Sequence, residues 1–251
     1  MSKQALIDYT LHLADNTLIL AQRNSEWTGH GPILEQDIAL SNIALDLLGQ
    51  ARMFYQYAAR LQGNGATEDS LAYLRDSWDF KNCLITELDK GDWAKTTLRQ
   101  FFFSVYQWFL YHQLQKSKDT ELAAIAAKAI KEVAYHLRWS GEWVVRLGDG
   151  SGESHRRISN ALHDLWPYTG ELISAAGYEQ TLAAEGIAAD PSSFKDEWLS
   201  KVNAILDEAT LSIPSNNWMQ NGGKEGKHTE HLGYVLAEMQ YLQRTYPGNE
   251  W

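Results

Sequence analysis

The chain has 251 residues, 44% of them hydrophobic and 22% charged, so it can bury a sizeable core, and we expect one domain over residues 1–251. Its formal net charge of -10 and the lack of a Lys and Arg cluster exclude nucleic acid from the expected partners, because such a surface repels phosphate backbones. The single cysteine, Cys83, excludes an intrachain disulfide, and no apolar run reaches signal-peptide or membrane-spanning length, so we expect a soluble, cytoplasmic protein with no membrane partner.

Two long helices are predicted in the first quarter of the chain. The first covers residues 7–23, and the second covers residues 33–61 after a glycine and proline turn. Residues 64–91 are less regular, with a short helix predicted near residues 70–78. The apolar stripe of the second helix alternates spacings of three and four, as in long helices that pack nearly antiparallel.

Two more long helices are predicted in the middle of the chain. Asp92 is a suitable N-cap for a helix that reaches about residue 116, and its aromatic residues lie on all sides, so we expect it to be buried. The next helix covers residues 121–147 and ends at the glycines of residues 148–150.

The last part of the chain contains shorter helices. One begins near Glu153 and is expected to bend or end at Pro167. Another is capped by Asp190, with Pro191 in its first turn. Residues 212–228 form a polar, glycine-containing segment that we expect to be irregular and on the surface, before a final helix over residues 229–244. No strand and no internal repeat is predicted.

Polar residues interrupt the apolar stripes near the middle of each long helix. Such residues need partners when they are buried, so together they predict an interior hydrogen-bond network. Taken singly, each is more often part of the structure than a ligand. The rows comprise Asp8, His12 and Asp15; Asn42, Asp46 and Gln50; Gln100, Ser104, Gln107 and Tyr111; and Lys128, Glu132, His136 and Ser140.

A di-iron bundle of the ferritin type carries Glu-x-x-His on each of two helices, because a spacing of three puts carboxylate and imidazole on one face. The equivalent positions here hold Leu47 with Gln50 and Val133 with His136, so an aliphatic residue replaces each Glu. We therefore predict an all-α, ferritin-like four-helix bundle with additional peripheral helices, with neither a bound cofactor nor a catalytic residue. Its degenerate centre comprises Asp15, Asp46, Leu47, Gln50, Ser104, Gln107, Glu132, Val133 and His136.

A second group of ligand-type residues precedes the final helix and consists of Glu225, His228, Glu230 and His231. Their spacing makes a small metal site conceivable. Gly226 argues against a regular helical geometry for Glu225. We favour the alternative in which Thr229 caps the last helix and the His and Glu residues form surface or interface hydrogen bonds.

Three stretches carry a specific family resemblance: residues 45–52, residues 127–138 and the tail of residues 227–244. They resemble the C subunits of bacterial phenylacetyl-CoA epoxidases, the PaaC family, and the similarity runs from the first helix to Trp251. The resemblance implies a ferritin-like fold and a place in a multicomponent monooxygenase that epoxidises the ring of phenylacetyl-CoA in aerobic phenylacetate degradation.

The resemblance also implies the partners. In that family the A subunit holds the di-iron site and the substrate, a reductase subunit delivers electrons from NADPH, and the C subunit is a non-catalytic structural partner of the A subunit. We therefore expect a hetero-oligomer with the catalytic di-iron subunit and the other subunits of the complex, including the reductase. No catalytic residue is carried over, because the Glu-x-x-His ligands have no counterpart here.

Two alternatives remain open from the sequence. One is a divergent metal-dependent oxidase that uses Asp15, Asp46, Glu132 and His136. The other is a general helical interaction module unrelated to oxygenases. The ten Trp and twelve Tyr either face another chain or fill gaps between large helices.

Overall fold

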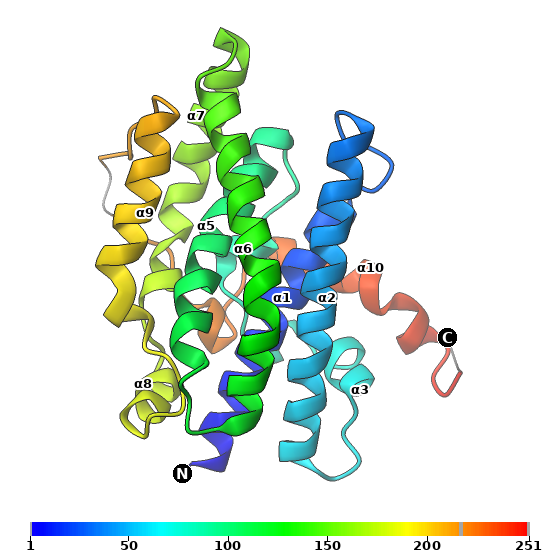
Figure 1. The fold of residues 1–251 in the computed structure, drawn as a ribbon. Coiled ribbons are helices and arrows are strands. Elements are labelled where there is room, and N and C mark those ends of the chain that lie inside the picture. The colour runs from blue at the N-terminus through cyan, green and yellow to red at the C-terminus, as the bar shows by residue number, and fades with distance from the viewer. Residues whose placement is uncertain (1, 216–217, 250–251) are drawn as a thin grey trace. The chain divides into compact units, whose positions relative to one another are not determined.

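The computed structural model describes residues 2–215 and 218–249, and these residues form helices and loops without a strand (Figure 1). The predicted all-α class is confirmed. The chain divides into two compact units, Met1–Asp89 with Gly222–Trp251, and Lys90–Asn221. Each unit is built on one pair of long antiparallel helices, as a ferritin-like chain requires of each half. The single domain remains a prediction.

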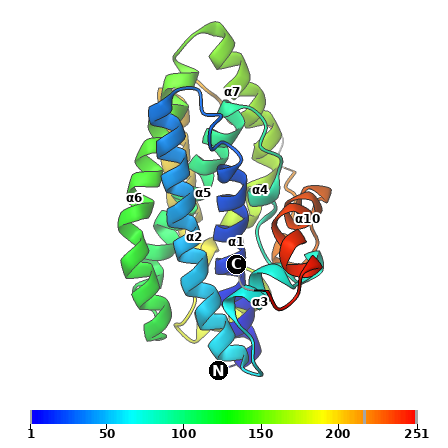
Figure 2. The same cartoon turned by 90° about the vertical axis from the view of Figure 1, so that its right-hand side faces the viewer.

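The first unit consists of a helical hairpin with three shorter helices packed around it. Helix α1 (Lys3–Ser25) pairs with α2 (Leu34–Gln62) along most of its length. The shorter helices are α3 (Glu68–Tyr73), α4 (Leu84–Glu87) and α10 (Glu230–Thr245), and Figure 2 shows α3 and α10 side by side. Seventeen residues of α1 are buried, so this helix forms the centre of the unit's core.

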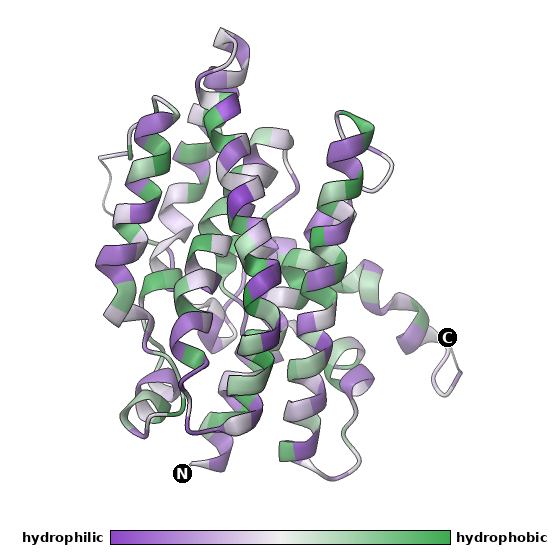
Figure 3. Cartoon of the chain, in the orientation of Figure 1, coloured by the Kyte–Doolittle hydropathy of each residue, from purple (hydrophilic) through white to green (hydrophobic). Residues whose placement is uncertain are grey.

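The second unit has the same plan. Helix α5 (Trp93–Leu114) pairs with α6 (Thr120–Gly148), and α7 (Gly152–Leu165) and α9 (Lys195–Glu208) pack against this pair. A short α8 (Gly177–Ala184) follows α7 in the chain. In Figure 3 hydrophilic and hydrophobic residues alternate along α7 and α9, as expected of helices with one face on a core. Helix α5 is buried on most sides, as predicted.

The helix ends follow local sequence signals. Asp92 caps α5 by accepting from the Lys95 amide at 3.0 Å, and Thr229 caps α10 by accepting from the His231 amide at 3.3 Å. Pro167 lies just after the end of α7, in a 3-10 turn, as predicted. Asp190 caps a 3-10 turn, Pro191–Phe194, which leads into α9.

Three short elements differ from the predictions. The helix predicted near residues 70–78 is α3 at Glu68–Tyr73, followed by a separate 3-10 turn at Ser77–Asp79. It begins earlier because Thr67 and Ser70 form a capping box. Helices α4 and α8 were not predicted, because each is too short to give a periodic pattern.

The segment 212–228, predicted to be irregular, contains a 3-10 turn at Gly223–Glu225, and residues 216–217 of this segment lie outside the described residues. Gly223 and Lys224 are buried, so part of the segment is packed rather than on the surface. None of the helices within residues 2–215 and 218–249 is long and apolar enough to cross a bilayer.

Gly226 follows this turn, and we expect its replacement by alanine to lower the unfolding free energy by about 3 kcal/mol. Its φ is +82°, and an added Cβ would collide with the carbonyl oxygen of Trp78. Gly29 is a matched control, because it has a φ of +81° but nothing within 4 Å of an added Cβ. Gly29→Ala should cost only about 1 kcal/mol. Urea denaturation measures both unfolding free energies. Equal losses of unfolding free energy in the two variants would show that the collision with Trp78 has no effect.

Candidate functional site

Asp15 lies near the middle of α1 and is completely buried. Arg75 donates to both of its carboxylate oxygens, at 3.1 Å from Nη1 to Oδ2 and through a short contact from Nη2 to Oδ1. The Tyr55 hydroxyl donates to Oδ1 at 2.5 Å, and the Lys81 amide donates to Oδ2 at 2.8 Å. We call these four residues the Asp15 cluster. Three neighbouring residues therefore donate hydrogen bonds to the Asp15 carboxylate, and the Arg75 guanidinium balances its negative charge.

The electrostatics of the Asp15 cluster favour the ion pair between the Asp15 carboxylate and the Arg75 guanidinium. Burial raises the pKa of Tyr55 well above its ordinary value, and the Asp15 carboxylate raises it further, so the phenol stays a neutral donor. Burial by itself lowers the pKa of Arg75, but the Asp15 carboxylate outweighs it, and the pKa lies above the ordinary value. The Arg75 guanidinium also stands 4.1 Å from the centre of the Phe80 ring, which adds a cation–π contact.

His12 and Asn16 extend the same face of α1. The His12 Nδ1 atom lies 2.7 Å from the Lys81 carbonyl oxygen, and Asn16 Oδ1 accepts from the Cys83 amide at 2.8 Å. Asn16 also contacts the His12 ring at 3.2 Å. Together with Asp15, these residues bind backbone groups of residues 81–83. These contacts hold that segment in place against α1.

Glu87 forms the second buried polar group of this unit. Its carboxylate accepts from Asn82 Nδ2 at 2.8 Å, from the Thr229 amide at 2.6 Å and from the Thr229 hydroxyl at 2.9 Å. His228 Nδ1 lies 2.7 Å from Glu87 Oε2, and His228 Nε2 lies 2.9 Å from the Phe80 carbonyl oxygen. We call Glu87, Asn82, His228 and Thr229 the Glu87 cluster. It attaches the start of α10 to α4.

The contacts of His228 are those of a protonated imidazole. A carbonyl oxygen and an ionised carboxylate only accept, so both ring nitrogens must donate. Burial by itself lowers the pKa of His228, but the hydrogen bond and the charge of Glu87 outweigh it, and the pKa is raised above 6.5. His228 and Glu87 thus form a buried ion pair.

The group predicted before the last helix is not assembled as one cluster. His228 faces Glu87, whereas His231 Nε2 lies 3.8 Å from Asp89 Oδ1. Glu225 lies 3.9 Å from Lys227, and Glu230 is exposed in the first turn of α10. The hydrogen bonds of the His228 side chain are therefore made within the chain and are buried, and His231 faces a carboxylate of the same chain.

The other predicted centre residues lie on α2, α5 and α6. Leu47, Gln50 and Val133 are completely buried, and Asp46 and Glu132 are half-buried. Ser104 accepts from Gln100 at 2.9 Å, and Gln107 donates to the Tyr111 hydroxyl at 3.2 Å. Burial raises the pKa of Tyr111 well above its ordinary value, and the Glu132 charge adds to the shift. His136 is completely buried, and its carbonyl accepts from Ser140 at 2.6 Å.

Sequence reasoning missed Tyr55, Arg75, Asn82 and Glu87, which supply most of the partners in the two clusters. Tyr55, Arg75 and Glu87 pair with residues distant in the chain, and Asn82 acts through Glu87, so no local spacing could identify the clusters. Within residues 2–215 and 218–249, no three His, Cys, Asp or Glu side chains come together in an arrangement that could hold a metal ion. The described residues thus do not fit the carboxylate-rich ligand set of a di-iron centre.

Comparisons with known proteins agree with the resemblance seen in the sequence. The model of a family described as phenylacetic acid catabolic protein matches residues 1–251. The chain is 50% identical over 246 residues to a protein of Escherichia coli (strain K12) that is named as the C subunit of 1,2-phenylacetyl-CoA epoxidase. That match covers 98% of this chain and 99% of the relative.

Proposed function

Because the chain belongs to the family of phenylacetic acid catabolic proteins, we propose that it is the non-catalytic C subunit of a phenylacetyl-CoA epoxidase. In this role it pairs with the di-iron subunit and stabilises it, while the di-iron subunit carries out the ring epoxidation with electrons that a reductase takes from NADPH. The name of the 50% identical relative supports the assignment to the C subunit. We further infer that the protein acts in the cytoplasm.

The Asp15 cluster is the observation that carries the non-catalytic role. Of the positions that correspond to lone carboxylate ligands, only Asp15 retains a carboxylate, and Arg75 supplies the positive charge that faces it. Aliphatic side chains stand at the two paired positions, Leu47 and Val133. Because these positions supply too few carboxylates, the positive charge of two bound iron ions would remain uncompensated.

An exposed apolar stripe on α2 supports the pairing. Leu34, Ile38 and Leu45 are 72%, 52% and 64% exposed and lie on one face of the helix. Gly49 continues the same face, with nothing within 4 Å of an added Cβ. Such a face suits the close approach of a helix from another subunit.

Co-expression with the matching di-iron subunit tests this function. The two chains should migrate as one species in gel filtration, and the soluble yield of the di-iron subunit should rise. The chain purified alone should contain well below one iron per molecule even when iron is in excess, because its ligand set is incomplete. About two irons per isolated chain would instead support a divergent oxidase.

The variant Leu45→Glu places a charge in the middle of the α2 stripe and should weaken the pair at least tenfold in affinity, about 1.4 kcal/mol. Leu74→Glu is the matched control, since Leu74 is 56% exposed in the same unit but lies outside the stripe. Independent migration of the wild-type chains, with the di-iron subunit equally soluble and active alone, would rule out the structural role.

A further inference from the structure

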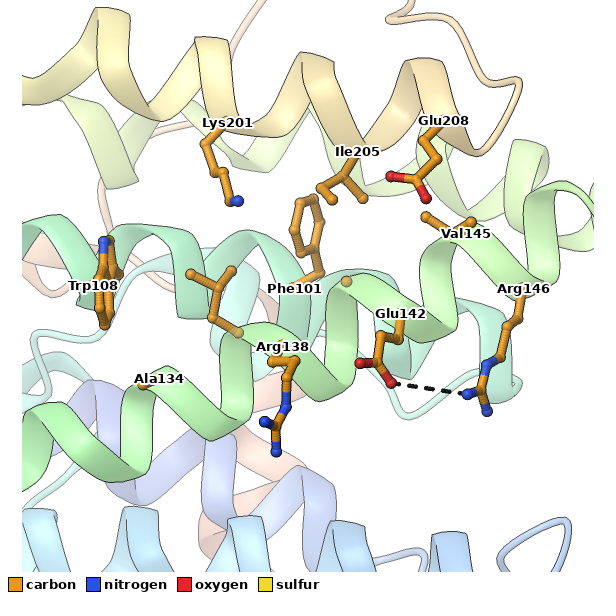
Figure 4. A pocket seen from close by; sticks show the side chains of 12 residues that line it. Phe101, Trp108, Ala134, Arg138, Glu142, Val145, Arg146, Lys201, Ile205 and Glu208 are labelled. Atoms are coloured by element: carbon orange, nitrogen blue, oxygen red, sulfur yellow. Dashed lines mark ion pairs between the residues drawn. The ribbon is translucent and has the colours of Figure 1, made fainter.

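A groove in the second unit takes no part in the function proposed above (Figure 4). It lies between α6 and α9, with α5 behind them, and has a volume of about 450 Å³. Its apolar lining includes Phe101 of α5, Leu137 and Gly141 of α6, and Ile205 of α9. Small-ligand pockets are usually concave and mainly apolar, with volumes of about 300–1,000 Å³. The groove therefore has the size and lining of such a pocket.

Gly141 keeps the groove open. An added Cβ would meet Phe101 at 3.7 Å and Ile205 at 3.8 Å, which are ordinary contact distances, so the packing of the unit does not require glycine. Glycine in the interior of a helix costs about 1 kcal/mol relative to alanine. The missing side chain leaves space against Phe101 that a ligand can fill.

Two charged residues of α9, one basic and one acidic, lie at opposite ends of the groove. Lys201 reaches from α9 toward α6, and Glu208 lies two turns further along α9, about 10 Å away at 1.5 Å per residue (Figure 4). No carboxylate within residues 2–215 and 218–249 pairs with Lys201. Glu142 lies 3.8 Å from Arg146, and Arg138 leaves α6 on the side away from α9 (Figure 4). On α9, one cation and one anion thus stand at the two ends of the apolar centre, while Arg138, Glu142 and Arg146 line it from α6.

We propose that this groove binds a small organic monoanion, with its apolar ring or chain against Gly141 and its carboxylate paired with Lys201. Burial of the apolar part supplies most of the affinity, and the ion pair sets the orientation. Glu208 disfavours a second anionic group at the opposite end. The inference does not depend on the proposed function, since pairing with the di-iron subunit requires no ligand on this chain.

Three probes test the charge pattern on the full chain by isothermal titration or ligand-observed NMR. Phenylacetate carries one carboxylate, phenylacetamide is its neutral counterpart, and 1,4-phenylenediacetate carries a carboxylate at each end. Phenylacetate should bind saturably, and each of the other two should bind about fivefold more weakly, as expected for one partly exposed ion pair. Equal affinities, or no saturable binding of phenylacetate at millimolar concentration, would overturn the proposal.

Variants test the location. Gly141→Leu should abolish phenylacetate binding by filling the groove, and Ile205→Trp should do the same from the α9 wall, in case the first variant misfolds. Lys201→Gln should remove the preference for phenylacetate over phenylacetamide. Gly233→Leu, a matched change in helix α10 where an added Cβ has open space, should leave binding unchanged.

Binding that survives both filling variants would place the ligand elsewhere and overturn the proposal. A second result would also overturn the proposal: phenylacetate fails to bind, and Gly141→Leu prevents co-purification with another protein of the complex. The groove would then receive a protein side chain instead of a small ligand.

Discussion

Replacement of Arg75 by methionine is expected to lower the unfolding free energy by about 3–5 kcal/mol at neutral pH. The substitution leaves the buried Asp15 carboxylate without its balancing cation, while the Tyr55 hydroxyl and the Lys81 amide remain. It also removes the donor groups that Arg75 directs to the Leu71 and Asp79 carbonyls, at 2.5 and 2.9 Å. Urea denaturation followed by circular dichroism measures the loss.

A double-mutant cycle separates the ion pair from these other contacts. Asp15→Asn with Arg75→Met should be more stable than the sum of the single variants implies, because neither charge is then left alone. Arg52→Met is the matched control in the same unit, since the Arg52 side chain is 69% exposed and pairs with Glu68 at 2.9 Å. It should cost less than about 1 kcal/mol. A loss of that small size for Arg75→Met would show that the Asp15 cluster does not hold the fold.

The cycle also bears on the proposed function. If Asp15 only holds the fold, a double variant that still folds should support full epoxidation when it is combined with the other proteins of the complex. Loss of turnover by a folded double variant that still pairs with the di-iron subunit would instead indicate a chemical role for Asp15.

The sequence predicts the long helices well because their signals are local. The apolar spacing of residues 33–61 and the Asp92 cap place helices α2 and α5 to within one or two residues of their ends. The same periodicity places Leu47 and Val133 in the core, where both are buried. Local patterns are sufficient here because a long helix repeats its signal over many turns.

The partners of the polar residues could not be predicted in the same way. Asp15 meets Arg75 across 60 residues, and His228 meets Glu87 across 141. Arg75 and Glu87 both lie in the stretch 64–91, where α3 and α4 are too short to show a period. The polar residues on the long helices could therefore be identified, but the side chains that neutralise them could not.

The unfolding free energy of the protein is expected to fall as the pH rises above neutrality, because of the ion pair between His228 and Glu87. The pKa of His228 is raised in the folded chain, so the folded state holds this proton more tightly than the unfolded state does. The resulting stabilisation is fully present below the unfolded pKa of 6.5 and is lost as the pH rises through the folded pKa.

Neighbouring charges act on the same pair and must be separated from it. Arg23 donates to the Glu87 carbonyl at 2.8 and 3.0 Å, and the Asp15 charge contributes to the raised pKa of His228. His231 faces Asp89 at 3.8 Å and is 30% exposed. Since a second histidine lies this close, the pH dependence must be assigned with variants.

His228→Ala should lower the unfolding free energy at pH 6 by about 2–4 kcal/mol, because it leaves the Glu87 carboxylate buried without its cation. It should also flatten the decline above pH 6.5. His231→Gln, the matched control, should keep most of that decline because the His228 pair remains. Urea denaturation at several pH values measures both effects. A wild-type stability that rises over this range, or a decline that persists in His228→Ala, would contradict the assignment of the charge to His228.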